Sequence, residues 1–440
     1  MAELKRSLGL FEAMICGVGI ILGAGIYALI GKAAGMAGNA VWISFVIAAI
    51  VAGLSGLSYA ELSSIFPKAG AEYEYTRNAF GKKIAFIVGW MIALSGIIGA
   101  STVALGFGGY FEGMFGTPIL LTAIVLVVLL SLVISYGVRE AAWFAIIGTL
   151  FEAGGLLIVI LIAVPYFGSV DYFEIPSFDG LFAAAALVFF AYIGFEEMTR
   201  MAEEVKEPEK NMPRALILAV AITTVFYILV AIAAVSVVDF NALAASNSPL
   251  ADVVSAAWSS DAFFAFSIIA LFATGNTVLL IMMAASRIIY GMADSGALPK
   301  AIAYVNPSRR TPWAAIAVTC ALTLGFFMAG GIEKIASLTN FTVFATFIMI
   351  NLALIKLRHD RRDMERPFRV PLNIGWFPVL PALAVVATLF MMMNVGTVAM
   401  VDGTMLIALG VVAYVLIDKF THRGVQMKEA VHPKKKKVRI

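Results

Sequence analysis

Long apolar stretches, separated by short polar segments rich in proline and glycine, run through the whole 440-residue chain. Many of these stretches reach the roughly 20 residues that a helix needs to cross about 30 Å of hydrocarbon. The pattern predicts an all-α polytopic membrane protein with twelve spans. They are expected at residues 10–30, 39–65, 84–110, 118–136, 142–165, 181–200, 214–238, 262–293, 313–330, 335–357, 376–394 and 402–418.

Lysine and arginine are distributed unevenly between these spans. If the N-terminus lies inside, twelve spans place the C-terminus inside as well, and all but two of the 31 lysines and arginines then fall on the inner side. The exceptions are Lys32 and Lys334. Cytoplasmic loops of membrane proteins carry such an excess of positive charge. We therefore expect a multi-pass protein of the cytoplasmic membrane with both termini in the cytoplasm.

The composition narrows the function further. Hydrophobic residues make up 61% of the chain and charged residues 13%, against about 25% charged residues in soluble domains. The basic tail at 421–440 is expected to contact anionic lipid rather than nucleic acid. Two distant cysteines and three histidines in polar segments give no metal-binding spacing, so we expect no cofactor. Whether the protein is a monomer or a homodimer stays open.

Four glycines interrupt the first predicted span, in the stretch GVGIILGAGIYALI at residues 17–30. Glycine inside a helix costs about 1 kcal/mol relative to alanine, so its presence needs a reason. One interpretation is close helix packing through Gly19 and Gly23, a small-xxx-small pair. The other is that the helix unwinds at Gly23, Ala24 and Gly25, so that freed amide hydrogens face a substrate carboxylate.

A second interruption, FFAYIGFEE at 189–197, lies in the sixth span. Its carbonyl groups are suited to an ammonium group, with Phe190 and Tyr192 as aromatic walls. An offset of five spans inverts the second half of the chain relative to the first. Matching breaks in inverted halves indicate a transporter's binding site, and channels and enzymes do not generally need them. The predicted units are residues 1–165 and 180–357 as the two repeats, 376–420 as the last two helices, and the tail.

Three motifs resemble the amino acid–polyamine–organocation superfamily of permeases. They are GVGIILGAGIY in the first span, FFAYIGFEEMTRMAEEVKEPEKNMPRAL around the sixth, and ASRIIYGMADSGALPKAIAYVNPSRRTPWAAI around the eighth. The resemblance implies a leucine-transporter-like fold of five-plus-five inverted repeats with two further helices. It also implies that an α-amino acid binds between the broken first and sixth helices, and that the protein works by alternating access.

The same resemblance implies roles for individual residues. Amides near Ala24 and Gly25, with Gly23 opening the helix, would hold the carboxylate. Carbonyls near Phe190, Ala191 and Ile193 would hold the amine, and Gly194 would keep the second break open. The substrate side chain is expected to touch Ile21 and the third-span stretch 99–102, which includes Ser101. That stretch carries no charge, which favours a neutral amino acid.

Glu152 lies ten residues into the predicted fifth span, where an unpaired carboxylate is costly and burial favours its protonated form. Many members of the resembled superfamily have a lysine here that carries the coupling proton, so this sequence departs from the pattern. Glu152 is expected either to carry a proton, or to ligate sodium together with Thr274 and Asn276. The alternative is a structural, protonated Glu152 that bonds to a neighbouring hydroxyl or carbonyl.

Glu196 follows the second break directly. It is expected to cap that break or to pair with Arg287 in an inner gate, and the alternative is a solvated helix face. Taken together, the sequence predicts a secondary transporter for neutral α-amino acids, coupled to protons as a symporter. An amino acid exchanger and a sodium-coupled symporter remain alternatives. The chain has no HExxH or GxSxG motif that would indicate an enzyme.

Overall fold

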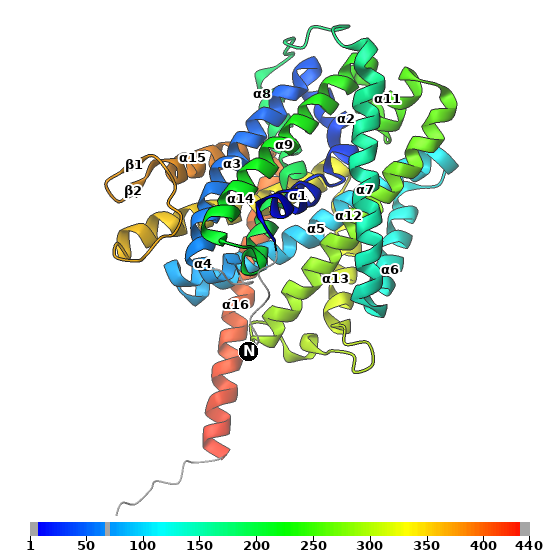
Figure 1. Cartoon of the computed structure of the whole chain (residues 1–440). Coiled ribbons are helices and arrows are strands. Elements are labelled where there is room, and N and C mark those ends of the chain that lie inside the picture. Colours follow the sequence, from blue (N-terminus) through cyan, green and yellow to red (C-terminus); the bar gives the residue numbers. More distant parts are fainter. Residues whose placement is uncertain (1–7, 67–70, 432–440) are drawn as a thin grey trace, which may run out of the picture.

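The computed structural model describes residues 8–66 and 71–431, and all side chains within them except those of residues 71, 138–147, 200–204 and 418–431. Nearly all of this part of the chain is helical (Figure 1). The α-helices are α1 (Leu10–Ile21), α2 (Gly25–Ala37), α3 (Val41–Ile65), α4 (Ala71–Phe80), α5 (Lys82–Phe115), α6 (Ile119–Tyr136), α7 (Val138–Ala163), α8 (Phe178–Val188), α9 (Pro208–Val237), α10 (Phe240–Ala245), α11 (Pro249–Ala257), α12 (Ser260–Asp294), α13 (Trp313–Phe326), α14 (Ile332–Asp360), α15 (Val379–Met393) and α16 (Thr397–Val431).

Short 3₁₀ segments and one small hairpin complete the fold. The 3₁₀ segments are η1 (Gly38–Ala40), η2 (Val164–Tyr166), η3 (Phe189–Tyr192), η4 (Phe195–Glu204), η5 (Lys300–Ala303) and η6 (Phe327–Ala329). Strands β1 (Asn373–Ile374) and β2 (Phe377–Pro378) pair antiparallel in the connection between α14 and α15.

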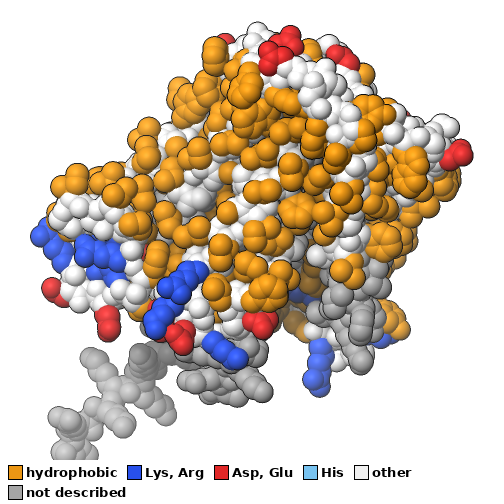
Figure 2. Space-filling model, turned by 45° about the horizontal axis from the view of Figure 1, so that its top comes forward, with side chains coloured by type: hydrophobic (Ala, Val, Ile, Leu, Met, Phe, Trp, Pro, Cys, Tyr) orange, Lys and Arg blue, Asp and Glu red, His pale blue; other side chains and the backbone are white. Residues whose placement is uncertain are grey.

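Nine segments of the described chain are long and apolar enough to cross a membrane, and three shorter apolar helices accompany them. The prediction of a mostly helical polytopic membrane protein is therefore confirmed, while the count of twelve spans and the inverted repeat stay predictions. Figure 2 shows hydrophobic side chains over most of one face, with lysine and arginine gathered toward one end. An apolar exterior of this kind suits contact with lipid.

The first predicted span is two helices, because α1 ends at Ile21 and α2 begins at Gly25. The sixth predicted span is also interrupted: α8 ends at Val188, η3 follows, and η4 starts only after a turn at Gly194, whose φ is +123°. That φ lies in a region that favours glycine. Both predicted breaks are thus present in the structure.

A membrane helix that stops in mid-span leaves carbonyl groups without partners, and lipid cannot supply them. Asn340 on α14 solves this problem at the end of α8. Its side-chain nitrogen donates to the carbonyl oxygens of Ala186 at 2.6 Å and Leu187 at 3.0 Å. The second break is therefore held by a side chain from a distant part of the sequence.

A buried cluster of charged groups fixes the connection between α14 and α15 against α3. The carboxylate of Glu61 on α3 is fully buried and accepts hydrogen bonds from Arg358 of α14 and from the backbone N–H of Val370, the latter at 2.8 Å. Arg366 lies 3.4 Å from the same carboxylate. This cluster ties the ends of three segments together outside the region of the two breaks.

Candidate functional site

A cavity of about 430 Å³ lies where the two broken helices meet. This volume is within the usual range for sites that bind small molecules, roughly 300–1,000 Å³. Its walls come from both breaks and from α3, α4, α5, α7, α12 and α14. Lining residues from the breaks are Gly19, Ile20, Ile21, Gly23, Gly25, Phe190, Ala191, Ile193, Gly194, Glu196 and Glu197, and the other walls include Tyr59, Gly99, Glu152, Thr277, Thr339 and Phe347.

The two breaks touch each other through their backbones. A Cβ atom added at Gly25 would lie 2.7 Å from the Cα of Ala191 and 3.2 Å from its nitrogen. Gly23, in contrast, has room, because an added Cβ would lie 3.6 Å from the nearest atom, the hydroxyl of Thr277. Gly25 is thus required for close approach of the two breaks, whereas a Cβ at Gly23 would make only ordinary contacts.

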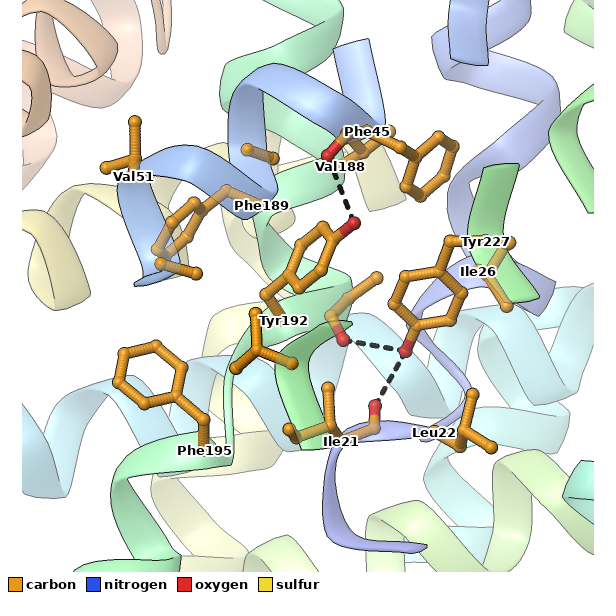
Figure 3. Close-up of a cluster of buried hydrophobic side chains, with 14 of the residues drawn as sticks. Ile21, Leu22, Ile26, Phe45, Val51, Val188, Phe189, Tyr192, Phe195 and Tyr227 are labelled. Carbon is orange, nitrogen blue, oxygen red and sulfur yellow. Dashed lines mark hydrogen bonds between the residues drawn. The ribbon is translucent and has the colours of Figure 1, made fainter. Parts of the chain in front are cut away.

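Tyr227 on α9 joins the two breaks from the side (Figure 3). Its hydroxyl oxygen is 2.6 Å from the carbonyl oxygen of Ile21 and 2.8 Å from that of Ala191. A phenol has a single hydrogen to donate, so the two carbonyls share it. The carbonyl oxygen of Ile21 also accepts the backbone N–H of Gly23 at 2.6 Å, so both of its lone pairs are used. The carbonyl oxygen of Ala191 can still accept another donor. Sequence reasoning missed Tyr227, because a tyrosine in an apolar helix gives no sign of which carbonyls it will reach.

Glu152 is buried on α7 and connects to the first break through Thr277 on α12. The hydroxyl of Thr277 donates to Oε1 of Glu152 at 2.5 Å, and its oxygen accepts the backbone N–H of Ala24 at 3.1 Å. Asn276 lies beside this carboxyl group, yet among the described residues neither polar atom of its side chain has a hydrogen-bond partner. Thr274 does not reach the carboxyl group, because its hydroxyl donates to Ala270 in its own helix at 2.7 Å. Thr274 and Asn276 are the partners of Glu152 predicted from the sequence, and Thr277 was missed.

Three of the predicted substrate-binding residues do not line the cavity with their side chains. Ser101 donates to the carbonyl of Thr323 on α13 at 2.9 Å, so it faces that helix. Tyr192 points away from the cavity and donates to the carbonyl of Phe45 at 3.0 Å (Figure 3). Ala24 contributes its backbone N–H, which Thr277 accepts. The other predicted residues of this group, Ile21, Gly23, Gly25, Phe190, Ala191, Ile193 and Gly194, do line the cavity.

The predicted pairing of Glu196 with Arg287 does not occur in this structure. Glu196 accepts the backbone N–H of Gly194 at 3.0 Å and so caps the second break. Arg287 instead donates to the carbonyl of Met283 and to the hydroxyl of Ser286, both on its own helix. The guanidinium group of Arg287 folds back along α12 because these acceptors lie one turn or less away from it.

The cavity extends from the breaks toward one side of the protein only. Its walls on α5, α12 and α14 run from Gly99, Thr277 and Thr339 toward the helix ends at Lys82, Asp294 and Asp360. These ends carry the basic connections that the sequence places in the cytoplasm. The cavity is therefore directed to the side with the excess of positive charge.

The opposite side of the breaks is tightly packed. Lys32 on α2 donates to the carbonyl of Ala244 at the end of α10 at 2.5 Å. A Cβ added at Gly31 would collide with the carbonyl oxygen of Leu243, and one at Gly109 on α5 would collide with that of Asn247. The segment between α9 and α12 thus covers this side of the breaks.

Residues 8–417 match the Amino acid permease family. The chain is 30% identical over 442 aligned residues to the branched-chain amino acid permease BcaP of Bacillus subtilis, which covers 95% of this chain and 94% of that protein. It is 29% identical to the methylthioribose transporter of the same organism, with the same coverage. It is also 31% identical to the vacuolar cationic amino acid transporter 2 of Arabidopsis thaliana, over 83% of this chain and 61% of the plant protein.

These relatives are permeases and transporters, which confirms the resemblance noted from the three motifs and places the chain among transporters and not enzymes. The apolar helices agree with a multi-pass protein of the membrane. The chain belongs to the amino acid permease family.

Proposed function

We propose that this protein is a secondary transporter that carries neutral α-amino acids across the cytoplasmic membrane by alternating access, in symport with protons. The observation that supports this most directly is the single cavity at which the backbones of both broken helices meet. The free carbonyl lone pair at Ala191 suits an ammonium group, and the amides that open α2 suit a carboxylate. Main-chain groups of the protein would thus hold the substrate through its ammonium and carboxylate groups.

A neutral side chain fits the wall beyond the breaks. Gly99, Thr339 and Phe347 carry no charge there, whereas the four glutamates that border the cavity lie on other elements, α4, α7 and η4. The relatives' names give different substrates. The proposal of a neutral substrate therefore rests on this wall and not on the relatives. The proposal assigns the basic side to the cytoplasm, so that the cavity faces inward and Lys32 with α10 closes the outer side, and the packing of Lys32 against Ala244 supports it.

Purified protein in liposomes tests this proposal. We expect an inwardly directed proton gradient, without sodium, to drive uptake of a labelled neutral amino acid from a panel of L-leucine, L-isoleucine, L-valine, L-alanine, L-lysine and L-arginine. Uptake only from liposomes preloaded with an amino acid would show an exchanger. Uptake that requires sodium would show a sodium symporter. Either result would contradict proton symport.

Replacing Tyr227 by phenylalanine is expected to weaken substrate binding by about tenfold, because loss of one hydrogen bond to two buried carbonyls frees both break ends to move. Binding of the best substrate in the panel to purified protein measures the effect. Tyr192→Phe is the matched control, since it removes a buried hydroxyl that bonds to the carbonyl of Phe45. Equal loss of affinity in both variants would show that bridging the breaks is not what Tyr227 contributes.

A further inference from the structure

Groups on three helices form a continuous hydrogen-bonded chain from a buried carboxyl to the first break. The N–H of Ala24 donates to the hydroxyl oxygen of Thr277, and this hydroxyl donates to Glu152. Thr277 and Glu152 both border the cavity. Thr277 thus lies between a group that can bind a proton and the backbone of the first break.

The direction of the Thr277 hydroxyl depends on whether Glu152 carries a proton. An ionised carboxylate only accepts hydrogen bonds, so Thr277 must give its single hydrogen to it. A protonated carboxyl group can itself donate to the oxygen of Thr277. That oxygen has two lone pairs, so it accepts from Glu152 and Ala24 together, and its own hydrogen becomes free to turn into the cavity.

Among the described neighbours of Glu152, Thr277 is the one whose hydroxyl bonds to the carboxyl group. From α2, Tyr27 donates to the main-chain oxygen of Glu152 at 2.7 Å and not to its carboxyl group. Asn276 of α12 lies beside the carboxyl group, but its side chain has no hydrogen-bond partner among the described residues. The hydroxyl of Tyr227 on α9 is directed to the carbonyls of Ile21 and Ala191. Across the described residues, Glu152 forms no ion pair with a lysine, arginine or histidine.

The other carboxyl groups of the cavity form a separate set. Glu72, Glu196 and Glu197 come from α4 and η4, and they act on one another and not on Glu152. Thr277 is therefore the contact that joins the carboxyl group of Glu152 to the first break.

We propose that Thr277 is a positioning residue that turns protonation of Glu152 into a new hydrogen-bond donor for the substrate carboxylate at the first break. This inference rests on the proposed proton symport and assigns the contact that links the two ligands. A donor that exists only in the protonated state makes proton binding and substrate binding favour each other, and this coupling is reciprocal. Deprotonation on the inner side turns the hydroxyl back to Glu152 and withdraws the donor.

Equilibrium binding of labelled L-leucine, or of the panel member with the fastest uptake, tests this in sodium-free buffer on both sides of neutral pH. Wild-type protein is expected to bind about tenfold more tightly at the acidic pH, the worth of one hydrogen bond to a charged group. Thr277→Val should bind weakly at both pH values, and Thr277→Ser should restore the wild-type difference. Thr274→Val is the matched control, because its hydroxyl bonds within α12.

Glu152→Gln separates this inference from the proposed symport. If Glu152→Gln binds equally at both pH values while Thr277→Val keeps the wild-type difference, Glu152 couples the proton without Thr277, and the inference is overturned. If wild-type binding does not change with pH, proton coupling itself fails and the inference falls with it. Only variants that elute as a single species on size exclusion are compared, and Thr277→Ser reports on the hydroxyl if Thr277→Val does not.

Discussion

Replacing Gly25 by alanine is expected to weaken substrate binding by on the order of 100-fold while the protein still inserts and folds. The added Cβ would lie 2.7 Å from the Cα of Ala191, and this neighbour is backbone that cannot rotate away. The two breaks would have to separate, and their amides and carbonyls would no longer converge on one ligand. Binding of the labelled amino acid to purified protein measures the loss.

Gly23→Ala is the matched control, because its Cβ would sit at an ordinary contact distance of 3.6 Å from Thr277. We expect its affinity to stay near that of the wild type. Wild-type affinity in Gly25→Ala would contradict the proposed grip and would return the glycines of the first span to a role in packing. A similar loss in both variants would show that cavity volume, and not the contact between the breaks, limits binding.

Replacing Glu61 by glutamine is expected to destabilise the protein by about 3–5 kcal/mol, the usual effect of removing one partner from a buried ion pair. Arg358 is only 2% exposed and would lose its counter-charge, while a single amide oxygen would have to replace the two carboxylate oxygens that accept from Arg358 and Val370. The connection between α14 and α15 would then be held less firmly against α3. Thermal unfolding in detergent measures the change.

An exposed ion pair on α14, the helix that carries Arg358, provides the control for this experiment. Lys356 and Asp360 approach to 2.6 Å, with 42% and 43% of their side chains exposed. Asp360→Asn is expected to leave the unfolding temperature near that of the wild type, because water screens an exposed pair. An equally small effect of Glu61→Gln would show that the buried cluster does not stabilise the fold.

Both breaks could be located from the sequence because glycine destabilises a helix. Its presence in a span therefore marks a position that is required for something other than helix stability. Gly25 and Gly194 show this well, since one permits backbone contact and the other adopts a positive φ. Glu152 was recognisable for a similar reason, because a carboxyl group inside a span needs an explanation. Each of these signals is local and can be read from a few neighbouring residues.

The hydrogen-bond partners of these residues could not be predicted from the sequence. Helix α5 is buried on most sides, so its periodicity does not indicate a face, and Ser101 was expected at the cavity although it contacts α13. Thr274 and Thr277 are one turn apart on α12, and only packing against α7 shows which hydroxyl reaches Glu152. Arg287 could have paired with Glu196 on charge alone, yet nearer acceptors on its own helix take its hydrogens.

The sequence by itself determined that this is a helical membrane protein with two interrupted helices and a buried acid, because hydropathy, glycine cost and charge burial act locally. The tertiary structure alone decided which side chains hold the breaks. Tyr227 reaches Ile21 across 206 positions, Thr277 reaches Ala24 across 253, and Asn340 reaches Leu187 across 153. Hydrogen bonds act only over about 3 Å, so these partners exist only once distant helices have packed together.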